Sequence, residues 1–128
     1  MSSELIARAI TARERAIAPY SGFKVGAALR TKAGTVYEGC NIENATYGLT
    51  VCAERVALLK ALSEGERDFE AMAVVTDADT LTTSCGSCRQ LMWEFCGDIT
   101  VFLHSLKGLD GTHRLSELYP EPFDSTNL

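Results

Sequence analysis

Apolar residues recur at helical spacing in three stretches of the chain. Residues 3–18 repeat them three, four or seven positions apart, which places them on one face of a helix. Pro19 predicts the end of this helix, because the residue before a proline avoids helical backbone. Two more helices are predicted over residues 52–63 and 85–95, each followed closely by a glycine that can end it. The buried face predicted for the earlier of these two comprises Val56, Leu59 and Leu62.

Strand patterns fill the intervals between these helices. Residues 24–30 alternate apolar and polar side chains, and residues 35–42 follow a short turn, which is typical of a β-hairpin. Nearly continuous apolar runs at residues 72–76 and 99–103 predict strands that are covered on both faces. This order of elements predicts one α/β domain over residues 1–128, built in layers around a mixed sheet. The end of the chain is predicted as a polar turn and then a short helix or strand, over residues 104–112 and 114–118.

Charge and composition narrow the range of partners. The 128 residues are 46% hydrophobic with a net charge of −5, and no two Lys or Arg residues are adjacent. A nucleic-acid surface usually needs a basic stripe to neutralise phosphates, so a free small molecule is the favoured partner and nucleic acid is not expected. No apolar stretch approaches the roughly 20 residues that span a bilayer, and no signal-peptide pattern begins the chain. We therefore expect a cytoplasmic protein with no membrane partner, whose five cysteines bind metal or stay free.

Two short segments carry the candidate chemistry. Val-Cys-Ala-Glu-Arg occupies residues 51–55, and Ser-Cys-Gly-Ser-Cys-Arg-Gln occupies residues 84–90. Cysteine thiolates are soft ligands, and two of them separated by two residues, with a third far away in the chain, suit zinc. Three protein ligands leave one position of a tetrahedral zinc open, as in catalytic rather than structural sites. The glutamate places a carboxylate beside such a metal without acting as a ligand.

The Cys-Ala-Glu segment followed by Cys-x-x-Cys resembles the zinc-dependent cytidine deaminases in their small homotetrameric form. Residues 20–29, 39–48 and, less closely, 118–123 resemble further segments of that family. The resemblance implies a three-layer α/β/α fold with a mixed central sheet and one Zn²⁺ per chain. It also implies hydrolytic deamination of cytidine and 2′-deoxycytidine in pyrimidine salvage. Ser84 stands where the family has Pro, and we expect the zinc site to survive because Ser can cap the helix.

By this resemblance, Cys52, Cys85 and Cys88 are the zinc ligands, and Glu54 is the catalytic acid and base. Glu54 would take a proton from the attacking water, protonate N3 of the pyrimidine, and help the amine at C4 leave as ammonia. Arg55 would donate hydrogen bonds to the ligand thiolates, and would so tune the metal without binding it.

The other residues carried over from the family would bind the nucleoside. Phe23 would stack near the base, and the Ala53 backbone would contact it. Asn41 and Glu43 would hydrogen-bond the ribose 3′-hydroxyl, and a carboxylate there would repel a phosphate, which favours nucleosides over nucleotides. Neighbouring subunits of the homotetramer would complete each pocket through Ala45, Tyr47 and Phe123.

Other interpretations of the sequence are open at this point. The substrate can be another aminated pyrimidine-like compound, such as blasticidin S, although the ribose-binding segment favours a nucleoside. Asn41 and Glu43 can merely build a turn. Cys-x-x-Cys can hold a structural zinc in a non-catalytic module, which would need a fourth protein ligand. The candidates for that ligand are Cys40, Cys96, His104 and His113. None of them has another Cys or His nearby at the spacing typical of a zinc ligand pair.

Overall fold

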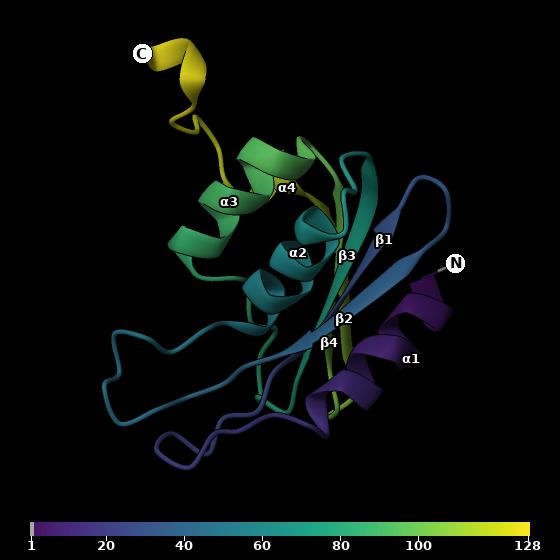
Figure 1. Ribbon diagram of the computed structural model, residues 1–128. Helices are drawn as coiled ribbons and strands as arrows, with labels where there is room; N and C mark the ends of the chain where they lie inside the picture. Colours follow the sequence, from purple (N-terminus) through teal and green to yellow (C-terminus); the bar gives the residue numbers. More distant parts are fainter. Residues whose placement is uncertain (1) are drawn as a thin grey trace.

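A mixed β-sheet forms the middle layer of the computed structural model, which describes residues 2–128 (Figure 1). The elements are α1 (Ser2–Arg13), β1 (Gly26–Thr31), β2 (Val36–Cys40), α2 (Ala53–Ser63), β3 (Phe69–Thr76), α3 (Gly86–Cys96), β4 (Thr100–Ser105), β5 (Leu109–Arg114), α4 (Leu115–Leu118) and the 3₁₀ turn η1 (Ser125–Asn127). The strands lie in the order β2-β1-β3-β4-β5. β3 and β4 run parallel, and the other neighbouring pairs are antiparallel.

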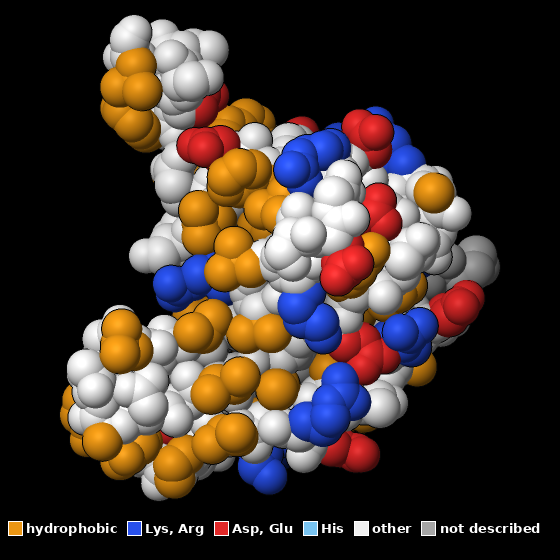
Figure 2. All heavy atoms as spheres, in the orientation of Figure 1, with side chains coloured by type: hydrophobic (Ala, Val, Ile, Leu, Met, Phe, Trp, Pro, Cys, Tyr) orange, Lys and Arg blue, Asp and Glu red, His pale blue; other side chains and the backbone are white. Residues whose placement is uncertain are grey.

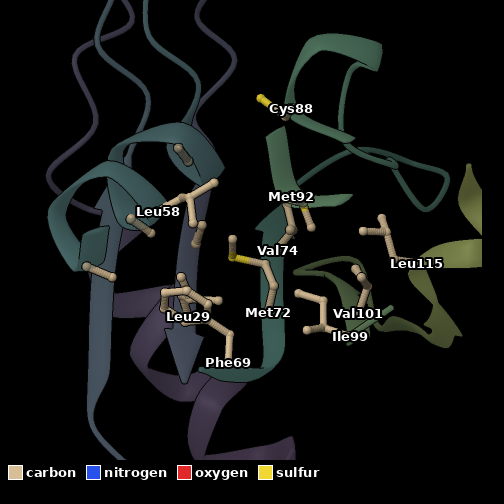
Figure 3. Packing of buried hydrophobic residues seen from close by; sticks show 14 of the residues in the cluster. Leu29, Leu58, Phe69, Met72, Val74, Cys88, Met92, Ile99, Val101 and Leu115 are labelled. Carbon is tan, nitrogen blue, oxygen red and sulfur yellow. The ribbon is translucent and has the colours of Figure 1, made fainter. Parts of the chain in front are cut away.

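Helices cover both faces of the sheet (Figure 1). α1 packs on one face, where Leu5 and Ala9 meet Ala28 of β1 and Val75 of β3. α2 and α3 cover the opposite face, over a larger apolar cluster that includes Met72 of β3 (Figure 3). β3 therefore buries side chains on both of its faces, and each leucine-sized side chain buried in this way stabilises the fold by roughly 1.5–3 kcal/mol. The predicted α/β/α layers and mixed sheet are confirmed.

The first helix is shorter than the predicted segment 3–18, because α1 ends at Arg13. Beyond it, the Ile17 N–H donates to the Asn41 carbonyl (3.0 Å), and the Glu43 N–H donates to the Ile17 carbonyl (2.8 Å). Ile17 thereby pairs with the segment that follows β2. A contact with residues distant in sequence replaces the last helical turn, so the local apolar spacing predicted the wrong end.

The buried face of α2 also differs from the predicted one, because Leu59 is 49% exposed. Small side chains face the sheet instead and allow the helix to approach it closely. A Cβ on Gly39 of β2 would lie only 2.4 Å from the Ala53 carbonyl oxygen. The buried residues of α2 are Ala53, Glu54, Ala57, Leu58 and Ala61.

Strand β5 begins within residues 104–112, a segment predicted to be a turn. β4 continues to Ser105, and β5 pairs with it at the edge of the sheet. The side chains of β5 are mostly exposed and polar, so no apolar alternation marks the strand in the sequence. α4 lies within residues 114–118, where a short helix or strand is predicted.

Gly26 lies beneath the end of α1, and we predict that Gly26→Ala destabilises the protein. An added Cβ would lie 2.0 Å from the Ala9 carbonyl oxygen and 2.6 Å from the Arg13 backbone nitrogen, so the helix must shift. Overpacking of this kind costs roughly 1–3 kcal/mol of unfolding free energy, measurable by urea denaturation. Gly48→Ala is the control, because its nearest contact would be 3.8 Å away. Equal stability of the two variants would contradict the prediction.

Candidate metal centre and cavity

Three cysteine sulfurs from two distant segments of the sequence meet at the starts of two helices. Cys52 is the N-cap residue of α2, Cys85 is the N-cap residue of α3, and Cys88 lies in the first turn of α3. Their Sγ atoms lie within 4.8 Å of one another, and those of Cys52 and Cys85 are 3.8 Å apart. The cluster forms because α2 and α3 pack side by side on the same face of the sheet.

The surroundings of the cluster favour the thiolate form of Cys52. No side chain caps the start of α2 or α3, so the free N–H groups and the helix dipoles face the sulfurs. Arg55 Nη2 donates to Cys52 Sγ at 3.7 Å. A hydrogen bond from Cys88 and the nearby Arg55 guanidinium lower the pKa of Cys52 to about 5. The same bond to Cys52, together with burial, raises the pKa of Cys88.

The donor set fits zinc. Zn–S bonds of about 2.3 Å in a tetrahedral site place sulfur pairs about 3.8 Å apart, which matches the distance between Cys52 and Cys85. No fourth His, Cys, Asp or Glu of residues 2–128 belongs to the cluster. The Nε–H group of Arg55 is buried and makes no hydrogen bond to residues 2–128, so it is free to donate a hydrogen bond near the sulfurs. These sulfurs can hold one metal ion and leave a position open.

Glu54 is buried in the first turn of α2 beside the cysteine cluster. Burial raises the pKa of its carboxyl, because the charged form loses water. The nearby Ser84 hydroxyl lowers the pKa of Glu54 by a smaller amount. The hydroxyl oxygen of Ser84 is buried and makes no hydrogen bond of ordinary geometry among residues 2–128. The carboxyl can therefore hold a proton as well as release one.

A cavity of about 280 Å³ opens beside the cysteines. Its wall includes Glu54 and two of the cysteines, Cys52 and Cys85. The fold also brings four of the residues expected to bind substrate to this wall, namely Phe23, Asn41, Glu43 and Ala53.

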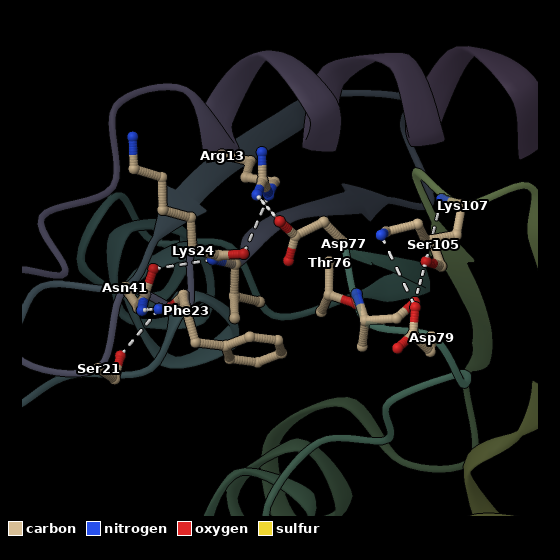
Figure 4. Close-up of polar contacts among 12 residues, drawn as sticks. Arg13, Ser21, Phe23, Lys24, Asn41, Thr76, Asp77, Asp79, Ser105 and Lys107 are labelled. Atoms are coloured by element: carbon tan, nitrogen blue, oxygen red, sulfur yellow. Dashed lines mark hydrogen bonds and ion pairs between the residues drawn. The ribbon is translucent and has the colours of Figure 1, made fainter.

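Asn41 and Glu43 brace this wall through the polypeptide backbone. Asn41 accepts from the Val25 N–H (2.9 Å) and donates to the Phe23 carbonyl (2.8 Å), as Figure 4 shows. The Glu43 carboxylate accepts from the N–H groups of residues 20 and 21 and from the Ser21 hydroxyl. These bonds lower the pKa of Glu43, so the carboxyl is ionised at neutral pH. Each side chain retains a free hydrogen-bonding position for a ligand.

Ala45, Tyr47 and Phe123 do not line the cavity of their own chain. Tyr47 is 67% exposed and contacts the Tyr20 ring edge-on at 5.3 Å between centroids. Phe123 is 56% exposed in the C-terminal tail, where its carbonyl accepts from Gln90 Nε2 (2.7 Å). The loop between β2 and α2 and the C-terminal tail project away from the body of the molecule (Figure 1). Hydrophobic side chains gather on the hollowed face between these two projections (Figure 2).

Several threonines line the cavity that were not predicted from the sequence. Thr76 ends β3, and Thr82 and Thr83 belong to the loop that leads to Cys85. A signal was available, because ligands commonly bind beyond the carboxyl ends of parallel strands, and β3 is one of the parallel pair. Arg89, which follows a cysteine as Arg55 does, instead donates to the Leu118 carbonyl and joins α3 to the end of α4.

The cysteine cluster and the adjoining buried carboxyl define a centre of the kind that hydrolytic metalloenzymes use. The chain belongs to the cytidine and deoxycytidylate deaminase family, because the model of that family's zinc-binding region matches residues 1–104. The family resemblance found in the sequence is thereby confirmed, as is the expectation of a zinc-binding deaminase domain.

Individual relatives resemble this chain over nearly its whole length. A cytidine deaminase from Sporosarcina psychrophila is 48% identical over 126 residues, covering 98% of this chain and 93% of the relative. A cytidine deaminase from Halalkalibacterium halodurans is 53% identical over 125 residues, with coverage of 97% and 95%. The crystal structure of a cytidine deaminase from Burkholderia pseudomallei superposes with a TM-score of 0.93 at 46% identity, covering 96% of this chain and 99% of that one.

We predict that Cys52→Ala weakens zinc binding by more than about 100-fold, the upper end of the loss expected for a residue that only supports a ligand. The reason is that one of the three clustered sulfurs is removed. Zinc content after dialysis against a graded chelator measures the effect. Cys96→Ala is the matched control, because Cys96 lies outside the cluster and should leave one zinc per chain. Equal zinc content in the two variants would contradict the assignment of the site.

Proposed function

We propose that this protein hydrolyses the amino group of cytidine and 2′-deoxycytidine, giving uridine or 2′-deoxyuridine and ammonia, in pyrimidine salvage. The observation that carries the proposal is that one cavity is lined by both the buried Glu54 and the clustered cysteines. The relatives described above support it, because their name is cytidine deaminase and they align with nearly the full chain.

Glu54 carries the protons of the reaction. The cysteines would hold one Zn²⁺, which when bound supplies a Lewis acid and lowers the pKa of water toward about 7. Glu54 accepts the proton that the attacking water loses and delivers it to N3 of the pyrimidine. It then transfers the second proton of that water to the amine at C4, which leaves as ammonia while the C4 oxygen becomes a carbonyl. A raised pKa suits a carboxyl that must keep a proton between these steps.

The cavity wall would orient the nucleoside. Phe23 offers its ring to the base, and the Ala53 backbone lies at the same wall. Asn41 and Glu43 would use their free hydrogen-bonding positions on the ribose 3′-hydroxyl. The ionised Glu43 carboxylate would repel a 5′- or 3′-phosphate, which favours free nucleosides over nucleotides.

We predict that Glu54→Gln lowers kcat for cytidine by about 10³-fold, the middle of the range for a general acid and base. The amide keeps the shape of the side chain but cannot carry a proton, so zinc content should be unchanged. Ammonia release and zinc content are measured on the same samples. Glu64→Gln is the control, because Glu64 is exposed at the other end of α2.

Three outcomes of this experiment distinguish the alternatives. Full activity of Glu54→Gln would remove Glu54 from the mechanism. Wild-type protein that holds zinc without turning over cytidine or 2′-deoxycytidine would refute the proposed substrates. Turnover of blasticidin S, without turnover of cytidine or 2′-deoxycytidine, would show that the substrate is another aminated pyrimidine-like compound.

We also infer a homotetramer in which neighbouring subunits complete each cavity. Tyr47 and Phe123 are exposed on the two projecting segments and lie outside the cavity of their own chain. Two further apolar side chains at the surface, Leu59 of α2 and Phe95 of α3, would also be covered by an association between subunits. Ala45 belongs to the same projecting loop as Tyr47 and would reach the neighbouring cavity with it.

A cytoplasmic location is also proposed. None of the five cysteines forms a disulfide, which suits a reducing compartment. Within residues 2–128, no helix has both the length and the apolar character to cross a membrane.

A mixing experiment tests the shared cavity. Phe123→Ala and Glu54→Gln should each be nearly inactive alone, because every cavity then lacks either the Phe123 ring or the Glu54 carboxyl. Refolding them together should restore roughly a quarter of the wild-type rate, because random assortment pairs an intact Glu54 with an intact neighbouring Phe123 in that share of cavities. Glu54→Gln mixed with Cys52→Ala is the control and should restore nothing. Mixed oligomers without recovered activity, or full activity of Phe123→Ala alone, would contradict the role of Phe123.

A further inference from the structure

Two walls of the cavity are irregular segments that come from distant parts of the sequence. One is residues 20–25, which carries Phe23, and the other begins after β3 at Asp77 and leads to Cys85. Neither segment is held by a ladder of strand hydrogen bonds. The pairing of Gly26 with Val75 fixes the ends of both segments that adjoin the sheet. Beyond that pairing, contacts outside the sheet must hold the two segments in place.

Arg13 contacts both walls from the end of α1 (Figure 4). Its Nε donates to the Lys24 carbonyl at 3.0 Å. Its Nη2 lies 3.1 Å from Asp77 Oδ2. The Arg13 side chain is 16% exposed and that of Asp77 is 48% exposed, so water reaches the ion pair from the Asp77 side and screens it in part.

The base of Arg13 is itself fixed by the fold. The helix α1 approaches β1 so closely that no side chain fits at Gly26, where a Cβ would lie 2.7 Å from Arg13 Cβ. An arginine suits the position because its rigid, planar guanidinium presents several N–H donors in fixed directions. The ammonium of a lysine is a single point and cannot reproduce that geometry toward two separate oxygens.

The loop after β3 is held from its other side as well. Ser105 Oγ donates to the Ala78 carbonyl, and the Leu106 N–H donates to the Thr76 carbonyl at 2.8 Å. These bonds fix the start of the loop to the β4–β5 turn, and Figure 4 shows Ser105 beside the loop. Arg13 therefore adds, beyond the pairing of β1 with β3, a side-chain contact between this anchored loop and the Phe23 wall.

We propose that Arg13 is a positioning residue that holds the Phe23 wall and the loop after β3 at the separation that a pyrimidine nucleoside requires. The inference rests on the proposed function for the identity of the ligand. Neither segment contains Glu54, so Arg13 acts on the binding of substrate and product more than on proton transfer.

Steady-state kinetics with cytidine test the proposal. Arg13→Met keeps the length of the side chain but removes both contacts. KM should rise about tenfold while kcat changes less than about threefold, the signature of lost binding that the ground and transition states share. Asp77→Asn removes the ion pair alone and should raise KM by a smaller factor. The double variant should match Arg13→Met, because both changes break one shared contact.

Hydrogen–deuterium exchange without substrate tests the tether independently of the activity. Arg13→Met should speed amide exchange in both residues 20–25 and residues 77–84. Arg15→Met is the matched control, because Arg15 pairs with Glu38 at 2.7 Å and lines no part of the cavity. It should leave exchange in both segments and KM as in the wild type.

The outcomes separate the tether from a general structural role and from the proposed function. A lower melting temperature with wild-type KM and wild-type exchange in both segments would overturn the proposal. If Arg13→Met does not fold, Asp77→Asn becomes the test. Wild-type KM and wild-type exchange in Asp77→Asn would then overturn the proposal. If the wild type does not deaminate cytidine, the proposed function fails, while faster exchange in Arg13→Met would still establish the tether.

Discussion

Three cysteine sulfurs within 4.8 Å of one another place several potential negative charges in one small volume. Like charges at such distances repel strongly where water is scarce. The surrounding structure offsets this repulsion with two helix starts and with the Arg55 guanidinium, 3.7 Å from Cys52. A bound divalent cation would offset it further. The need to hold these charges together explains why α2 and α3 both begin at a cysteine and why neither start is capped by another side chain.

The sheet decides where that cluster can form. α2 and α3 lie on the same face, and α3 belongs to the crossover between the parallel strands β3 and β4. The loop after β3 therefore delivers Cys85 to the carboxyl end of the strand, next to Cys52 and Glu54. α2 approaches β2 closely at Gly39, and Glu54 is buried in the first turn of the same helix, which raises the pKa of its carboxyl.

The cavity beside the cluster depends on polar side chains that bind backbone rather than one another. Asn41 and Glu43 fix residues 20–25, and Arg13 joins that segment to the loop after β3. Such bonds are directional, so they can define the shape of segments that lack regular secondary structure. The same residues thus serve both the fold and the cavity, and the turn-building and substrate-binding interpretations of Asn41 and Glu43 are compatible.

The sequence by itself was enough to predict the zinc-binding family and most of the elements. Three cysteines at short spacing in two segments predict the cluster that could hold a metal ion, and apolar periodicity predicts the three main helices and four strands. Tertiary structure decided the rest, because those features depend on partners distant in sequence. Ile17 leaves the helical path to pair beyond β2, Leu59 faces outward because small residues pack inward, and β5 forms at an edge without an apolar pattern. The place of Arg13 between two cavity walls has no local signature, since it arises only when the end of α1 meets Lys24 and Asp77.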